Sequence, residues 1–276
     1  MKTQDTGKFR ENTKDKFYTN VKVAQKCIAN ILAHVSEPNN YVWLEPSAGT
    51  GAFYNNIPIP LEKIGLDTEP YAEGIKKMDF HDWSPNPEKK YVVLGNPPFG
   101  RQSSQAKAFI KKSCKFATII AFILPKSFTK PSMNNAFARN FHLVHCEDLQ
   151  KKSFILNETA YDVPCVFQIW QNKTFNRNIE KKIAPVGFEY VKNTEEYHLA
   201  FRRVGALAGK SYKNNGSNYS VQSHHFIKLT NSDICDTLIE KINQHEFPSN
   251  TVGARSLSKH EINSVVNTLI TTVSSS

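Results

Sequence analysis

The chain has no long apolar run and no paired cysteines. None of its apolar stretches approaches the roughly 18 residues that span a bilayer, and the opening MKTQDTGKFRENTKDKF lacks the apolar segment of a secretory signal. The five cysteines are scattered without a CxxC pair, which favours free thiols in a reducing compartment. We therefore expect an intracellular protein, cytoplasmic if its host is bacterial or viral, with no membrane segment.

Clustered metal ligands are also missing. His142, His145 and Cys146 are close in sequence, but they fall on an expected strand, where positions i and i+3 face opposite ways. A tetrahedral site needs such side chains to converge. We therefore expect no bound metal. The sequence contains no indication of the oligomeric state.

Acidic residues are scarce in one stretch. Residues 101–153 contain ten Lys and Arg but only two acids, which places 10 − 2 = +8 of the net +10 there. Residues 27–100 contain five Lys and nine acids, or 5 − 9 = −4. This asymmetry indicates a polyanion-binding surface beside a site for a different ligand, although a solvated helix face is the alternative. The candidate nucleic-acid contacts are Lys107, Lys111, Lys112 and Lys126.

Hydrophobic periodicity predicts alternating strands and helices over the first part of the chain. This alternation is typical of an α/β fold, in which a mostly parallel sheet is flanked by helices on both faces. A further helix is expected after the glycine-containing turn that begins at residue 45. The remaining expected helices are 21–35 and 106–116, and the expected strands are 41–44, 63–67, 91–94, 117–124, 141–146 and 164–170.

The pattern changes after Gln171, where the long apolar strands stop. Two half-exposed strands are expected at 186–192 and 198–203, then a polar loop at 209–220 and helices at 232–245 and 258–271. The last helix opens with Ser258 and Glu261 at capping-box spacing. We place a boundary near residue 175, between a domain of residues 1–175 and a small α+β C-terminal region of residues 176–276.

A glycine-containing turn comes directly after the strand at 41–44. In Glu45-Pro-Ser-Ala-Gly49-Thr-Gly51, the glycines let the backbone approach a ligand closely. The third glycine of a dinucleotide motif is replaced by Tyr54, and no Gly-Lys-Ser/Thr phosphate loop occurs here. The turn therefore favours a nucleoside ligand without a pyrophosphate.

Acidic residues come at the next strand ends. Asp67 ends the strand at 63–67, where a carboxylate can accept both hydroxyls of a ribose. Asp79 can bind an adenine amino group, and the adjacent Phe80 can stack on the ring. Ligands of open α/β sheets bind beyond the carboxyl ends of the strands, where all these residues fall.

Asn96-Pro97-Pro98-Phe99 comes after the strand at 91–94. Each proline ring fixes φ, so two in succession hold the backbone in one conformation. The Asn96 side-chain carbonyl and a proline main-chain carbonyl can then accept both hydrogens of one NH2 group, while Phe99 stacks on a planar base. This arrangement favours transfer of a methyl group from a sulfonium to a conjugated amine, with catalysis by positioning. A rigid loop that merely ends the strand is the alternative.

Together these motifs resemble those of class I S-adenosylmethionine-dependent methyltransferases, specifically the N6-adenine (amino) DNA methyltransferases with an NPPF motif. Lys16-Phe17-Tyr18-Thr19 and the helix after it resemble their N-terminal cofactor motif, and the likeness covers about residues 16–172. It implies a Rossmann-like methyltransferase sheet, S-adenosylmethionine as cofactor and a C-terminal region for target recognition. The implied catalytic residues are Asn96, Pro97, Pro98 and Phe99, and the implied cofactor-binding residues are Tyr18, Thr19, Glu45, Pro46, Ala48, Gly49, Gly51, Asp67, Asp79 and Phe80.

The resemblance implies methylation of the N6 amino group of adenine in DNA, with the base flipped out of a duplex to reach Asn96. Phe128 or Phe154 would be the second aromatic beside that base. Three alternatives stay open. They are the same chemistry on RNA (adenine N6 or guanine N2), methylation of a protein glutamine, and a nucleic-acid-binding module without activity. The basic stretch favours nucleic acid over protein, and DNA over RNA is the leading expectation.

Overall fold

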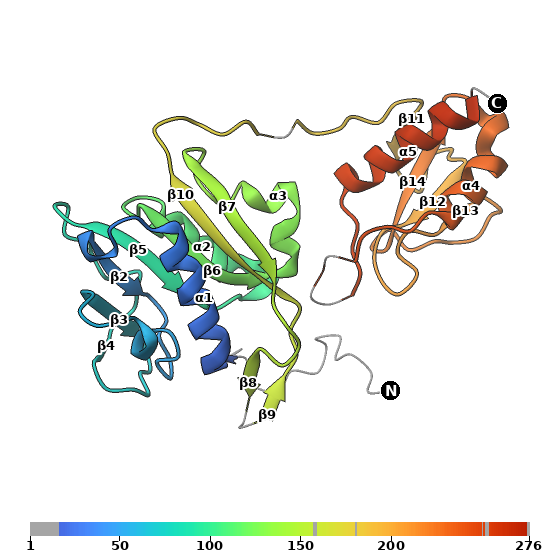
Figure 1. Cartoon of the computed structure of the whole chain (residues 1–276). Coiled ribbons are helices and arrows are strands. Elements are labelled where there is room, and N and C mark those ends of the chain that lie inside the picture. The colour runs from blue at the N-terminus through green and yellow to red at the C-terminus, as the bar shows by residue number, and fades with distance from the viewer. Residues whose placement is uncertain (1–16, 157–158, 180, 250, 252–253, 275–276) are drawn as a thin grey trace. The chain divides into compact units, whose positions relative to one another are not determined.

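The computed structural model describes residues 17–156, 159–179, 181–249, 251 and 254–274, and Lys16 of the expected N-terminal motif lies outside them. The chain forms two compact units (Figure 1). We call the described residues 17–179 the first unit and the described residues from 181 onward the second unit. In the described residues, no helix is both long and apolar enough to cross a membrane.

A seven-stranded sheet forms the centre of the first unit, in the order β4-β3-β2-β5-β6-β10-β7. The strands from β4 to β6 are parallel, and β10 runs antiparallel between β6 and β7. This confirms the predicted Rossmann-like α/β fold. The strands are β2 (Tyr41–Glu45), β3 (Lys63–Asp67), β4 (Ile75–Lys77), β5 (Lys90–Gly95), β6 (Ile119–Pro125), β7 (Phe141–Asp148) and β10 (Cys165–Asn172).

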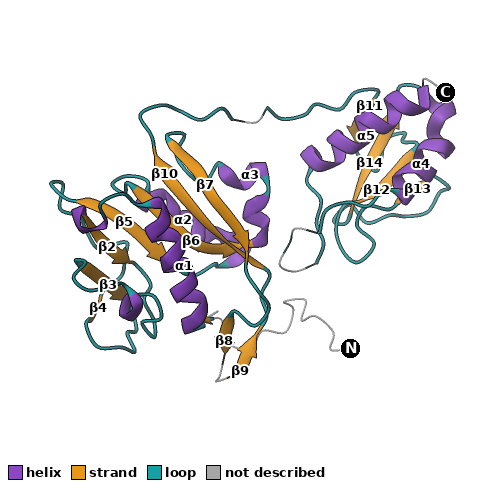
Figure 2. Cartoon of the chain, viewed as in Figure 1, coloured by secondary structure: helices purple, strands orange, loops and turns teal. Residues whose placement is uncertain are grey.

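Helices cover this sheet on both faces (Figure 2). Every residue of β6 is buried, so neither face of the strand is open to solvent. Helix α1 (Val21–His34) buries Ala24, Cys27, Ile28 and Ile31, a single stripe at helical spacing, and the Asn20 side chain caps its start. Helix α2 (Ser104–Ser113) buries a stripe in the core cluster of the sheet, and the short α3 (Pro131–Asn134) comes after β6 in the chain.

The helix expected after the glycine-containing turn is absent. Turns come after Glu45, and only a 3-10 helix at Tyr54–Asn56 forms. Pro58 and Pro60 come directly after it, and proline disfavours helix in the residue that precedes it. The glycine loop therefore leaves the end of β2 without an α-helix behind it.

A small second sheet in the first unit was not expected from the sequence. Strand β1 (Tyr18–Thr19) pairs antiparallel with β8 (Phe154–Leu156), which pairs with β9 (Thr159–Tyr161). This pairing brings the expected N-terminal motif beside a segment well over a hundred residues later in the chain.

The second unit is a four-stranded antiparallel sheet with two helices on one face. The sheet order is β11-β14-β12-β13, and its core consists of residues from the sheet and both helices. The expected capping box forms, since Ser258 N–H donates to Glu261 Oε2 at 2.8 Å and Glu261 N–H donates back to Ser258 Oγ at 3.3 Å. The elements are β11 (Phe188–Val191), β12 (Leu199–Arg202), β13 (Ser211–Lys213), β14 (His224–Leu229), α4 (Cys235–Gln244) and α5 (Lys259–Ser274). Strand β13 corrects the prediction of a loop throughout 209–220.

Candidate active site

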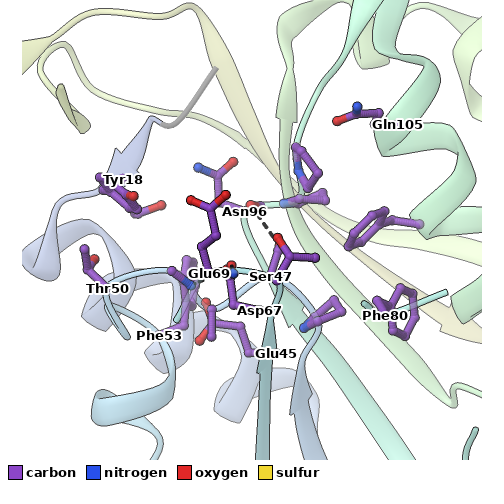
Figure 3. Close-up of a pocket in the computed structure, with 18 of the residues that line it drawn as sticks. Tyr18, Glu45, Ser47, Thr50, Phe53, Asp67, Glu69, Phe80, Asn96 and Gln105 are labelled. Atoms are coloured by element: carbon purple, nitrogen blue, oxygen red, sulfur yellow. Dashed lines mark hydrogen bonds between the residues drawn. The ribbon is translucent and has the colours of Figure 1, made fainter. Parts of the chain in front are cut away.

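A cavity of about 460 Å³ lies beyond the carboxyl ends of β2, β3, β4 and β5. The chain passes from β2 outward to β3 and β4 and then crosses to β5 on the other side, so the cavity lies at the point where the strand order reverses. All the predicted catalytic and cofactor-binding residues except Gly51 line it. Figure 3 shows Tyr18 and Thr50 on one side, Phe80 and Gln105 on the other, and Asn96 and Asp67 between them.

The two glycines of the loop make different contacts. Gly49 has φ +50°, and a Cβ there would lie 2.9 Å from Cε1 of Tyr18. Its N–H donates to Oδ2 of Asp67 at 2.7 Å. Gly51, at φ +80°, donates its N–H to the Ala48 carbonyl at 2.7 Å and closes the turn without lining the cavity. Both positions therefore require glycine: Gly49 packs against Tyr18 of the cavity wall, and a Cβ at Gly51 would lie 2.6 Å from Nδ2 of Asn55.

Glu45 lies beneath this loop and is 2% exposed. Its Oε2 accepts the N–H of Tyr54 at 2.7 Å, which ties the two ends of the loop together. Burial raises the pKa of Glu45 well above its ordinary value, the Tyr54 N–H opposes this, and the charge of Asp67 adds to it. Glu45 therefore holds the loop as well as lining the cavity.

Asp67 accepts two main-chain hydrogen bonds, one on each oxygen. Oδ2 binds Gly49 N–H at 2.7 Å and Oδ1 binds Glu69 N–H at 2.8 Å. A carboxylate offers roughly four acceptor positions, so each oxygen can still accept a hydroxyl. The two bonds fix the carboxylate in the orientation in which it faces the cavity.

Two residues beyond β4, Phe80 and Lys112, have partners that the sequence did not show. Phe80 lines the cavity, is 1% exposed and packs its ring on Phe109 with centroids 5.1 Å apart, so a ligand ring would meet it as part of a fixed wall. The Lys112 ammonium donates to the carbonyls of Phe80, His81 and Trp83 and lies 4.9 Å from the Phe80 ring centroid. Burial lowers the pKa of Lys112. Its charge holds this turn and is not presented for phosphate contact.

Asp79, in the same turn, is exposed, and its Oδ1 accepts the N–H of His81 at 2.7 Å. It lines the cavity, so one face of its carboxylate is available to a ligand.

Asn96 is held from two sides but leaves one atom without a partner. Its Nδ2 donates to the Phe17 carbonyl at 3.0 Å, and Ser47 Oγ donates to the Asn96 carbonyl at 3.2 Å. With Nδ2 anchored, Oδ1 is buried and has no hydrogen-bond partner in the described part of the chain. Thr19 Oγ1, in the same cavity, is in the same state. Buried polar atoms are nearly always satisfied, so two exceptions lining one cavity point to a polar ligand.

The aromatic residues around Asn96 differ from those expected. Phe128 and Phe154 are fully buried, so neither can flank a base. The rings of Phe17 and Tyr161 instead stack with centroids 5.2 Å apart and an interplanar angle of 15°. Tyr161 is 39% exposed, and Phe17 both lines the cavity and supplies the carbonyl that holds Asn96. Phe99 lines the cavity and is half-buried.

Several lining residues were not singled out from the sequence. Ser47 lies inside the glycine motif, and its hydroxyl anchors the loop of Asn96. Glu69 lies two residues after Asp67 and is drawn beside Asn96 in Figure 3. A second acid next to the expected ribose position was the available signal. For Gln105, which also lines the cavity, the sequence carried no signal.

The remaining lysines lie outside this cavity. Lys107 and Lys111 are exposed on α2. Lys126 pairs with Asp148 at 3.0 Å between side chains that are 32% and 63% exposed. An exposed pair of this kind contributes about 0–1 kcal/mol, so it does not prevent a phosphate contact. The described residues contain no group of three side chains able to hold a metal.

Comparisons with known proteins find fold relatives only. No family model matches the chain, and no curated protein matches it. Among solved structures, a proposed RNA methyltransferase of Pyrococcus horikoshii is 14% identical, with 61% of this chain and 94% of that one covered and a TM-score of 0.46. The 23S rRNA methyltransferase ErmE is 11% identical, with 58% and 71% covered and a TM-score of 0.43.

A third similar structure is the modification subunit of a proposed type I restriction enzyme of Vibrio vulnificus YJ016. It is 12% identical, with 87% of this chain and 55% of that subunit covered and a TM-score of 0.43. At these identities and TM-scores the likenesses carry no argument about cofactor or substrate. Those assignments depend on the geometry of the cavity.

Proposed function

We propose that the protein transfers a methyl group from S-adenosylmethionine to the N6 amino group of adenine in DNA. The observation that carries this proposal is the unpartnered Oδ1 of Asn96, a fixed acceptor in a cavity at the carboxyl ends of a Rossmann-like sheet. A buried acceptor without a donor is complementary to an amine, and it is placed by a loop whose two prolines limit its movement.

The cavity fits a nucleoside cofactor. A Cβ at Gly49 would meet the Tyr18 ring that lines the cavity, and Asp67 retains acceptor positions for the two ribose hydroxyls. Thr19 Oγ1 offers a further unpaired polar atom, and Asp79 lies at the end of the cavity lined by Phe80. When bound, the cofactor supplies the electrophilic methyl group. The residues of the chain hold it by its sugar and base.

The target amine is gripped by two acceptors. Asn96 Oδ1 takes one hydrogen, and the main-chain carbonyl of Pro97, a residue without an N–H, is the proposed acceptor of the other. This grip draws the nitrogen lone pair out of conjugation and aims it at the methyl group. Since the nitrogen loses its proton after transfer, no general base is required, and catalysis is mainly by positioning.

The target base is held by aromatic rings. Phe99 lies in the cavity beside Asn96, and the Phe17–Tyr161 stack offers an exposed ring on the same hairpin sheet that anchors Asn96. A base in a duplex is flipped out to reach such a site. The exposed cations Lys107 and Lys111 are the proposed phosphate contacts, with Lys126 after release from Asp148.

The test is methyl transfer from tritiated S-adenosylmethionine to DNA, RNA and protein mixtures, followed by mass analysis of the labelled product. We expect N6-methyladenine in DNA. N6-methyladenine or N2-methylguanine from RNA would move the substrate to RNA with the same use of Asn96. Label in protein glutamine, or no transfer to any mixture, would refute the proposal. Asn96→Ala is the matched control, since its labelling rate should fall by about 10²–10³.

A further inference from the structure

The second unit contains a cavity of about 500 Å³ that the proposed function does not use. It lies where β11 ends and β14 begins, and every residue that lines it belongs to the second unit. Its walls combine apolar residues such as Val191 and Phe226 with two histidines, and Lys192 and Lys259 lie on its lining.

His224 carries the clearest sign of a ligand. It is 6% exposed, and its Nδ1 lies 3.2 Å from the Ser220 carbonyl oxygen. The same Nδ1 lies 3.0 Å from Ser223 Oγ, which can donate or accept, so Nδ1 has a partner in either neutral tautomer. Burial lowers the pKa of His224, so the ring is neutral at pH 7. Nε2 is buried without a hydrogen-bond partner in the described part of the chain, so a polar group from outside is required.

Aromatic rings and cations line the rest of the cavity. The rings of Tyr190 and His225 have centroids 5.2 Å apart, and Lys259 Nζ lies 4.1 Å from the Tyr190 centroid. Burial lowers the pKa of His225 to about 4, and Arg203 and Lys259 lower it further. Glu195, which accepts the N–H of Lys192, is the one acid that lines the cavity. The lining therefore favours a ligand with a flat ring, a hydrogen-bonding edge and a negative charge.

We propose that this cavity binds one nucleotide of an unpaired nucleic-acid strand, with its base toward His224 and Phe226 and its phosphate toward Lys192 and Lys259. A nucleotide combines all three features. Bases in a duplex are already stacked and paired, so a ring can enter such a hollow only from an unpaired segment. Polyphosphate lacks the ring and its hydrogen-bonding edge.

The experiment measures binding of a fluorescent single-stranded DNA 12-mer to the full chain by anisotropy, without cofactor. Val221 lines the cavity and is 56% exposed, so Val221→Asp adds a repelling charge at the surface without disturbing the core. Val186→Asp is the matched control, because Val186 is 61% exposed in the same unit and does not line the cavity. We expect Val221→Asp to weaken binding about fivefold or more, which corresponds to the low end of the free energy of stacking one base. Val186→Asp should change the affinity little.

A second pair of variants tests the cations. Lys192→Gln with Lys259→Gln should lower the slope of log affinity against log salt by about 1.4, or about 0.7 for each phosphate contact on a single strand. Lys181→Gln with Lys182→Gln removes the same charge from exposed residues outside the cavity and should leave the slope nearly unchanged. Equal effects of the paired variants, or equal competition by polyphosphate and by oligonucleotide, would overturn the proposal.

This inference stands apart from methyl transfer. Asn96→Ala should bind the 12-mer as the parent does. Strand binding that depends on Val221, in a protein that transfers no methyl group, would leave the inference in place while refuting the proposed function. If the parent methylates DNA but Val221→Asp and Val186→Asp bind the strand equally well, the inference is refuted and the proposed function remains.

Discussion

The two cavities hold their polar groups in different ways. In the first unit, main-chain groups fix the side chains: Asp67 by two N–H groups, Asn96 by a carbonyl and Glu45 by the Tyr54 N–H. In the second unit, the lining is made mostly of side chains at a sheet end, with cations among them. Fixed dipoles suit a reaction in which sub-ångström placement sets the rate. Adjustable cations suit binding, in which many similar ligands must be accepted.

The sharpest test of this contrast is Asn96→Ala. If Asn96 Oδ1 grips the amine only as it reacts, turnover should fall by about 10²–10³, the range for one positioned polar contact. S-adenosylhomocysteine affinity, measured by calorimetry, should change little, since no contact of Asn96 with Asp67 or Gly49 is involved. Activity within a few-fold of the parent would mean that Pro97 and Pro98 form only a rigid strand end.

The close approach at Gly49 gives the next effect. Gly49→Ala would place a Cβ 2.9 Å from Tyr18 Cε1 at φ +50°, and such strain costs about 1–3 kcal/mol. Moving Tyr18, which lines the cavity, would relieve part of this strain, so we expect S-adenosylhomocysteine affinity in calorimetry to fall. Gly216→Ala is the control, because Gly216 has φ +80° with nothing within 4 Å of the added atom. If both variants bind the cofactor equally well, the glycine loop does not contact it.

Tyr161 tests the proposed substrate surface beside the cavity, because its ring stacks on Phe17, which lines the cavity. Tyr161→Ala removes the exposed ring stacked on Phe17. Removing an aromatic side chain on which a base stacks weakens binding by about 1–3 kcal/mol. KM for nucleic acid should rise, while cofactor affinity stays unchanged. Tyr161→Phe keeps the ring and should restore KM. A uniform fall in kcat without a change in KM would indicate that Tyr161 only supports the hairpin.

The residues of the site could be predicted where their roles are local. Asn96–Phe99 and the Glu45–Gly51 loop come directly after single strands, so their position depends on a few neighbouring residues. The same sequence pattern could not place Tyr161 beside Phe17, because that contact arises from the pairing of β1 with β8 and of β8 with β9. Nor could it show that Lys112 is held by a turn about thirty residues earlier.

The fold, like the site, could be predicted where the sequence signal is local. Strand alternation predicted the central sheet because each buried strand is a continuous apolar run, as in β6. Strand β13 was hidden because Ser211–Lys213 lies in a polar segment and gains its partner, β12, only in the folded unit. The helix expected after Gly51 is absent for a local reason. Pro58 and Pro60 are in the sequence and already disfavour a helix there.

The buried acid Glu45 predicts a pH effect on stability. Its pKa is raised in the folded state, so the folded state binds the proton more tightly than the unfolded state does. The protonated carboxyl of Glu45 therefore stabilises the fold in full below the pKa of the unfolded state, about 4.3. This contribution to stability is lost as pH rises through the pKa of the folded state. Glu45→Gln keeps an acceptor for Tyr54 N–H and removes the titration. Urea unfolding from pH 4 to pH 8 should show the parent losing more stability than the variant, and parallel profiles would contradict this.

The smallest expected effect concerns the exposed cations of the first unit. Lys107 and Lys111 lie on α2 outside the cavity, and each duplex phosphate that they neutralise should contribute about 0.9 to the salt slope of binding. Lys107→Gln with Lys111→Gln should therefore flatten the slope for duplex DNA by about 1.8, with cofactor affinity unchanged. Lys76→Gln with Lys77→Gln, exposed on β4, removes equal charge and serves as the control. An equal change in both double variants would mean that only net charge attracts the duplex. A change in the first alone would identify α2 as a phosphate-contacting surface, because only a local contact releases counterions at a particular helix.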